Sequence, residues 1–165
     1  MRTFGVWLTV GLAGLLLWSV IAPEEVVQPT PAMEFALENL DGDIVRLSDF
    51  QGEVVVIDFW ATWCAPCLTS FPSLHALLEP YFGEGVRLLL ICLDRSADPA
   101  REYLADQGFP TQDALWGSLH EARAVQELYS VVGIPWTIVI DRDGLIRYSG
   151  HPLHLSEDDL LPWLE

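Results

Sequence analysis

Two nearly continuous apolar runs predict the buried strands of this chain. Residues 54–60 (VVVIDFW) and 86–93 (VRLLLICL) are rich in β-branched and other apolar residues, a pattern typical of strands that are covered on both faces. A single acid, Asp58, interrupts the first run. Between the runs, residues 65–81 have a helical pattern, with a kink expected at Pro72. The three segments together predict a strand–helix–strand unit.

The remaining elements continue this alternation. Apolar and polar positions alternate on both sides of Asp41-Gly42, a dipeptide suited to a tight turn, so residues 35–47 are expected to form a hairpin. Further helices are expected at residues 98–107, 119–129 and 156–164, and a closing hairpin at residues 136–141 and 145–149. This order of elements predicts a layered α/β sheet.

The start of the chain has a different character. Residues 4–22 are nineteen positions without a charge, and as a helix they would measure roughly 28 Å, close to the hydrocarbon thickness of a bilayer. A cleaved signal peptide is the alternative, but Pro23 directly after the one candidate cleavage site disfavours cleavage. Arg2 before the run and Glu24 after it orient the N-terminus toward the cytoplasm. We therefore expect residues 1–22 to be a retained single-pass anchor.

A short linker is expected between this anchor and the folded domain. Residues 23–32 (PEEVVQPTPA) contain three prolines and no aromatic residue, which is typical of an extended, solvated spacer. The 133 residues from 33 to 165 have the size of a single domain with one core. The sequence has no internal repeat that would suggest a second domain.

The charge of the chain limits the classes of partner. It carries 24 acids and eight bases, all of them arginine, for a formal net charge of −16. Nucleic acid is not an expected partner, because phosphate binding needs clustered Lys and Arg. The absence of lysine also excludes Schiff-base catalysis and the P-loop lysine.

Two closely spaced cysteines carry the candidate chemistry. Cys64-Ala65-Pro66-Cys67 follows directly on a predicted buried strand and begins a predicted helix. Unpaired amides and the macrodipole at a helix N-terminus favour an anion, so Cys64 is expected to have a lowered thiol pKa and to act as the attacking thiolate. Cys67, one turn further on, can resolve a mixed disulfide. Pro66 in the first turn stiffens the loop without loss of a helical hydrogen bond. The pair is predicted to be a redox switch.

Other interpretations of the cysteines and histidines are weaker. Paired cysteines also ligate zinc, but a tetrahedral site needs a second Cys or His pair, and none has suitable spacing. An inert structural disulfide is a further alternative. Cys92, within an apolar strand, is interpreted as a buried small hydrophobe. His151 and His154 are interpreted as solvated loop residues, because no helix places both on one face. We expect neither a metal nor a cofactor.

The motif VVVIDFWATWCAPC, followed later by VVGIPWTIVID, resembles the core of the thioredoxin fold. The hairpin FALENLDGDIVRLSDFQGE and an insertion over residues 94–131 are similar to the TlpA/ResA-like group, which are membrane-anchored extracytoplasmic thioredoxins of the AhpC/TSA-redoxin type. The resemblance spans residues 33 to about 150. It implies a thioredoxin-like α/β fold, in which helices flank a central mixed β-sheet, with the N-terminal hairpin, the central insertion and one preceding transmembrane helix.

The resemblance also implies roles for individual residues. Cys64 and Cys67 correspond to the nucleophile and the resolving thiol of a redox-active disulfide. Pro135 matches the cis-proline that faces this disulfide; the alternative for Pro135 is an ordinary turn proline. Ile134 matches the residue before the cis-proline, whose backbone binds an incoming peptide. Asp58 matches the buried acid that assists deprotonation of the second cysteine, and a carboxyl on a covered strand is expected to have a raised pKa. A solvated strand end is the alternative for Asp58.

Two positions depart from the group. ResA-like proteins have a glutamate three residues after the second cysteine, where this chain has Ser70, so the acid role would fall on Asp58 alone. Many relatives have a small hydroxyl residue after the cis-proline, where this chain has Trp136. Its large ring lies beside the expected substrate groove and is a candidate for partner selection, with ordinary packing as the alternative. The expected substrate-binding residues are Trp63, Ala65, Pro66, Ile134, Pro135 and Trp136.

The resemblance implies a thiol-disulfide oxidoreductase that reduces disulfides in exported client proteins, with electrons from a membrane thiol donor and cytochrome c maturation as the commonest task. The implied location is the bacterial inner membrane, with the catalytic domain on the periplasmic side, or the free periplasm after signal cleavage. Ile134 matches reducing members of the fold, and a disulfide-forming oxidase is the alternative.

Two further functions are weaker alternatives. Peroxiredoxins share the early hairpin but have a proline seven residues and a hydroxyl residue three residues before the attacking cysteine, where this chain has Ile57 and Ala61. Copper metallochaperones of this fold use a wider cysteine spacing and a histidine that has no clear counterpart here.

Overall fold

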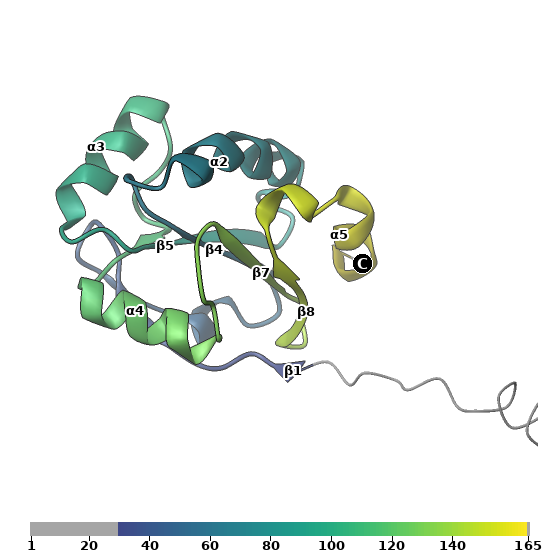
Figure 1. Cartoon of the computed structure of the whole chain (residues 1–165). Helices are drawn as coiled ribbons and strands as arrows, with labels where there is room; N and C mark the ends of the chain where they lie inside the picture. Colours follow the sequence, from purple (N-terminus) through teal and green to yellow (C-terminus); the bar gives the residue numbers. More distant parts are fainter. Residues whose placement is uncertain (1–29, 165) are drawn as a thin grey trace, which may run out of the picture.

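The computed structural model describes residues 30–164, in which helices cover both faces of a six-stranded sheet (Figure 1). The strands of this sheet are β1 (Thr30–Pro31), β4 (Val54–Trp60), β5 (Val86–Cys92), β6 (Ala114–Leu115), β7 (Trp136–Ile140) and β8 (Leu145–Gly150). Their spatial order is β1-β8-β7-β4-β5-β6. Strand β4 pairs in parallel with β5 and antiparallel with β7, so the mixed sheet of the predicted thioredoxin-like fold is confirmed.

The helices divide between the two faces of the sheet. They are α2 (Ala65–Leu78), α3 (Ala97–Gln107), α4 (Leu119–Leu128) and α5 (Glu157–Leu164). Helices α2 and α3 lie on one face and α4 on the other (Figure 1). Trp60 of β4 stacks on Phe71 of α2 with ring centroids 6.1 Å apart, and its ring lies 5.5 Å from that of Tyr103 in α3. Because side chains alternate along a strand, Asp58 points to the same face as Trp60, toward α2.

The predicted N-terminal hairpin is confirmed. Strands β2 (Ala36–Glu38) and β3 (Ile44–Arg46) pair antiparallel across the expected turn, where Gly42 has a φ of +96°. Asn39 organises the turn, since its Oδ1 accepts the N–H groups of Asp41 and Asp43. Its Nδ2 donates to the carbonyl of Gln112 at 3.1 Å, which ties the hairpin to the segment before β6.

Helix boundaries differ from the prediction by a few residues. Three short 3₁₀ helices complete the domain: η1 (Leu47–Phe50), η2 (Glu79–Tyr81) and η3 (Pro152–His154). Helix α2 runs through Pro72 but ends at Leu78, and η2 takes the place of the last predicted turn. Pro80 explains the change, because it has no N–H to continue the helical hydrogen bonds. Helix α3 ends as expected at Gly108, whose φ is +76°.

The edges of the sheet were not predicted. Thr30 and Pro31 pair with β8, so the ordered sheet begins inside the expected linker over residues 23–32. A proline is tolerated there because β1 is an edge strand. Strand β6 is only two residues long and is too short to show a periodic pattern. The expected anchor at residues 1–22 lies outside the described residues. Among residues 30–164, no helix combines the length and the apolar character that a membrane crossing requires.

Candidate active site

The two cysteines of the motif form a disulfide at the start of α2. Their Cα atoms are 5.3 Å apart. Cys64 occupies the N-cap position, and its Sγ accepts a hydrogen bond from the N–H of Cys67 at 3.2 Å. Cys64 is 5% and Cys67 1% exposed, whereas the adjacent Trp63 is 64% exposed. A partner molecule can therefore approach the disulfide along Trp63.

This position sets the reactivity of the pair. In the reduced state the Cys67 N–H and the N-terminus of α2 would stabilise a thiolate on Cys64, because both present positive charge to it. Pro66 lies in the first turn, where the absence of its N–H leaves no helical bond unmade. Ala65 and Pro66 between the two cysteines are exposed. The helix N-terminus and the exposed residues beside the disulfide therefore suit reversible thiol–disulfide exchange better than an inert structural link.

A cis peptide bond lies at the start of the neighbouring strand. The Ile134–Pro135 bond is cis, and β7 begins at the next residue. Trp136 pairs with Phe59 across β7 and β4, so Pro135 lies beside the end of β4 from which the Cys64 loop departs. The cis geometry expected for Pro135 is thereby found, in place of a plain turn proline.

Asp58 is a buried acid on the α2 side of the sheet. It is 1% exposed, which excludes a solvated strand end. Its Oδ1 accepts a hydrogen bond from Thr137 Oγ1 at 2.7 Å. Burial raises the pKa of Asp58 from 3.8 to about 7, and the Thr137 hydrogen bond offsets part of this rise. A carboxyl with this pKa can exchange a proton near neutral pH.

Asp94 is a second buried acid at the site, and the sequence reasoning missed it. Its Oδ2 accepts the N–H of Thr62 at 3.0 Å, and its Oδ1 accepts the Thr62 hydroxyl at 2.9 Å. The Cys92 thiol also donates to Oδ2, at 3.1 Å, and Trp116 Nε1 donates to the Asp94 carbonyl at 2.9 Å. Asp94 thus holds the loop that leads into Cys64. Its place directly after a predicted buried strand was the signal available in the sequence.

Loss of this carboxylate is expected to destabilise the fold. In Asp94→Ala, the N–H of Thr62 and the thiol of Cys92 lose their acceptor, so the free energy of unfolding should fall by roughly 2 to 4 kcal/mol. Asp94→Asn keeps one acceptor oxygen and should lose less. Urea denaturation of the oxidised proteins measures both effects. Asp98→Ala removes an exposed acid of α3 and serves as the control; an equal change in Asp94→Ala and Asp98→Ala would contradict the anchoring role.

Three other residues singled out in the sequence, Trp136, Ser70 and Cys92, are buried or half-buried in the domain. Trp136 is half-buried and its Nε1 donates to Ser149 Oγ at 3.0 Å, which favours packing over a free substrate surface. Ser70 is buried and donates to the Cys67 carbonyl at 3.2 Å. Cys92 is fully buried, and burial raises the pKa of its thiol. Within residues 30–164, no group of three or more His, Cys, Asp or Glu side chains is arranged to hold a metal ion.

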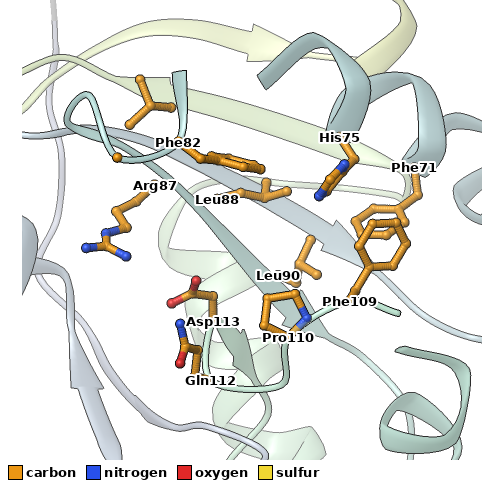
Figure 2. Close-up of a pocket in the computed structure, with 12 residues that line it drawn as sticks. Phe71, His75, Phe82, Arg87, Leu88, Leu90, Phe109, Pro110, Gln112 and Asp113 are labelled. Carbon is orange, nitrogen blue, oxygen red and sulfur yellow. The ribbon is translucent and has the colours of Figure 1, made fainter. Parts of the chain in front are cut away.

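A separate cavity lies away from the cysteines. It has a volume of about 260 Å³, and aromatic side chains from α2 and the loops around it form one end (Figure 2). Phe71, His75, Phe82 and Phe109 make up this end, while Arg87 and Asp113 lie at the other. The lining contains neither the disulfide nor Asp58 nor Pro135. We therefore assign the cavity no part in the chemistry of the pair.

Several known proteins with related sequences and structures are named as thiol-disulfide exchange proteins. The thiol-disulfide oxidoreductase ResA of Bacillus thuringiensis subsp. konkukian is 27% identical over 117 residues, which cover 70% of this chain and 64% of that protein. ResA of Bacillus subtilis is 28% identical over 125 residues, covering 74% of this chain and 66% of ResA. The chain therefore spans slightly less than two thirds of the length of these curated relatives.

The structural comparison agrees with the sequence comparison. A Chlorobium tepidum protein assigned as the thiol:disulfide interchange protein DsbE superposes with a TM-score of 0.71 and 30% identity, over 84% of this chain and 98% of the other. The profile of the AhpC/TSA family matches residues 29–149, which is well over half of the sequence. The chain therefore belongs to the AhpC/TSA family.

Proposed function

We propose that this protein is a thiol-disulfide oxidoreductase that uses Cys64 and Cys67 as its redox pair. The observation that carries the proposal is the disulfide at the N-terminus of α2, where Cys64 Sγ accepts the Cys67 N–H and a buried acid lies on the same face of the sheet. The names of the ResA and DsbE relatives support the same activity.

The proposed reaction is a two-step exchange. The Cys64 thiolate of the reduced protein attacks a client disulfide, forms a mixed disulfide and releases one client thiolate. Cys67 then loses its proton to the Asp58 carboxylate and attacks Cys64 Sγ. This second step forms the Cys64–Cys67 bond and releases the second client thiolate. Two electrons thus pass from the protein to the client, and a dithiol donor returns the protein to its reduced form.

The proposed function also includes the direction of electron transfer and the location of the protein in the cell. We infer a reductant of exported client proteins, with Cys64 and Cys67 recharged by a membrane thiol protein. Residues 1–22 would anchor the domain in the bacterial inner membrane, with the domain on the periplasmic side or, after cleavage, free in the periplasm. Cytochrome c maturation is the proposed task. The apolar run of residues 4–22 and the resemblance to the TlpA/ResA-like group support this inference.

The reduction potential tests the direction. The full-length protein in detergent would be equilibrated in glutathione and dithiothreitol buffers, with the fraction of reduced Cys64 and Cys67 read by alkylation and mass spectrometry. We expect a potential near or below about −270 mV, the value of a reducing thioredoxin. A Cys92→Ala variant should give the same potential. This result would show that the measured potential belongs to Cys64 and Cys67.

A value near −120 mV, as for a strong periplasmic oxidant, would overturn the reducing role and favour a disulfide-forming oxidase. Peroxide consumption by the reduced protein would instead favour a peroxidase. Binding of copper in a stoichiometric amount would favour a metallochaperone. Failure of the pair to exchange with either buffer would overturn the proposed activity itself.

A further inference from the structure

A groove lies between α4 and Trp63, the residue that directly precedes Cys64. It consists of two neighbouring hollows of about 330 Å³ and 570 Å³ that share Trp63, Leu93 and Arg123. The first hollow also contains Arg95 and Leu119, and the second continues to the loop before β7. We call the two hollows together the arginine groove.

The arginine groove lies against both segments that form the active site. Trp63 directly precedes Cys64, and Ile134, at the far end of the groove, directly precedes the cis-proline. On α4, Leu119 and Arg123 are four residues apart and so share one helix face. A peptide whose disulfide reaches Cys64 would therefore lay its flanking residues in this groove.

The charge of the groove is opposite to that of the molecule. The chain has a net charge of −16 and only eight basic residues, yet two of them, Arg95 and Arg123, line this one groove. Neither forms an ion pair with any other residue in the range 30–164, where the paired arginines are Arg87, Arg101 and Arg147. The lining contains a single carboxylate, that of Glu127.

Two apolar residues of the lining, Trp63 and Val132, are open to solvent. Trp63 is 64% and Val132 97% exposed, and both line the same hollow, as is typical of surfaces that contact a partner. Leu119, which is half-buried, and Leu93, which is buried, add apolar lining next to the arginines. The groove thus offers an apolar contact next to two guanidinium groups that have no ion-pair partner in the described part of the chain and are suited to a carboxylate.

We propose that the arginine groove selects client segments that carry an acidic residue near the disulfide, with an apolar residue beside it. Arg95 and Arg123 bind the client carboxylate, and Trp63 and Leu119 contact the apolar neighbour. This inference rests on the proposed function and adds a substrate preference to it. The two arginines also offset the repulsion that the acidic molecule would otherwise exert on such a client.

Two matched peptides test the preference. Each contains one intramolecular disulfide and a flanking apolar residue, and they differ only in a neighbouring Glu or Gln. The reduced full-length protein in detergent would be mixed with each peptide in about 0.1 M salt, where charges beyond about 10 Å are screened. Because an exposed ion pair contributes up to about fivefold and two arginines take part, we expect the second-order rate constant to be roughly three- to twentyfold higher for the Glu peptide.

The variants assign the effect to the groove. In the double variant Arg95→Gln, Arg123→Gln the preference should fall to less than about twofold, because the rate for the Glu peptide falls more than the rate for the Gln peptide. Arg46→Gln removes one positive charge from an exposed position on β3, outside the groove, and should keep the full preference, whereas Arg95→Gln or Arg123→Gln alone should reduce it. The preference of the wild-type protein should also shrink in 1 M salt.

Equal rates for the two peptides would overturn the inference and leave the proposed function intact, because both peptides would still be reduced. A preference that persists in the double variant, or that is lost equally in Arg46→Gln, would also overturn it. Failure to reduce either peptide would overturn the proposed function itself, and the inference with it.

Discussion

A Cys67→Ala variant is expected to trap its client as a stable mixed disulfide and to lose turnover. Cys64 keeps its position at the N-terminus of α2, so its thiolate still attacks the client. The second step needs the thiol of Cys67, whose N–H lies 3.2 Å from Cys64 Sγ and which no other described cysteine can replace, because Cys92 is fully buried. Catalysed turnover should therefore fall to the uncatalysed rate.

Mass spectrometry under non-reducing conditions measures this result directly. The Cys67→Ala protein should gain the mass of one client peptide, and dithiothreitol should remove it. The matched variant Cys64→Ala should be equally inactive but form no adduct at Cys67. An adduct in Cys64→Ala and none in Cys67→Ala would reverse the assigned roles, and continued turnover in either variant would contradict the two-cysteine reaction.

Asp58→Asn is expected to stabilise the protein at neutral and alkaline pH. The pKa of Asp58 in the fold is about 7 because of burial, whereas its ordinary value is 3.8. The folded state therefore holds a proton that the unfolded state has already released, and stability falls as the pH rises from about 4 to about 7. The difference between the two pKa values corresponds to roughly 4 kcal/mol above pH 7. Asparagine has no charge to bury and can still accept the Thr137 hydrogen bond.

Urea denaturation of the oxidised proteins at pH 4 and pH 8 tests this expectation. Asp58→Asn should be more stable than the wild-type protein at pH 8, by up to about 4 kcal/mol, and nearly equal to it at pH 4. A stability difference that is the same at both pH values would show that the Asp58 carboxyl does not change its charge in this range.

The same substitution should slow the second step of the exchange. If the Asp58 carboxylate accepts the Cys67 proton, the decay of the mixed disulfide should accelerate in the wild-type protein as the pH rises through about 7. Asp58→Asn should lower this rate by about a hundredfold and remove the inflection. Rapid-mixing kinetics with a fluorescent client peptide measures the decay.

Thr137 supplies the matched control for this kinetic effect. Its hydroxyl lowers the pKa of Asp58, so Thr137→Val should move the inflection to a pH above 7 without abolishing it. An unchanged inflection in both variants would assign it to another group, most simply to the cysteine thiols themselves.

Much of the fold could be predicted from the sequence because the signals are local. The six apolar positions of β4 and the turn at Asp41-Gly42 determine the local structure within a few residues. The same holds for the disulfide motif, because Cys64 and Cys67 are one helical turn apart and begin a helix directly after a buried strand. The amino-acid sequence therefore suffices to identify these cysteines as the candidate redox pair.

The site also depends on contacts between distant segments, which no local pattern encodes. Asp58 receives its hydrogen bond from a residue 79 positions away, and Asp94 holds Thr62 across 32 positions. A short edge strand such as β1 carries too few residues for a periodic signal and forms only because β8 offers it a partner. These features could not be read from periodicity.

The sequence by itself determined the central strands, the helices and the candidate redox cysteines of this protein, because periodicity and turn chemistry act between neighbouring residues. Only the tertiary structure decided the environment of those thiols. It buried Asp58 against Thr137, placed Asp94 under the active-site loop and brought Arg95 and Arg123 into one groove beside Trp63. Burial, pKa and charge complementarity arise from which segments meet in space, and that is settled by the packing of the whole sheet and its helices.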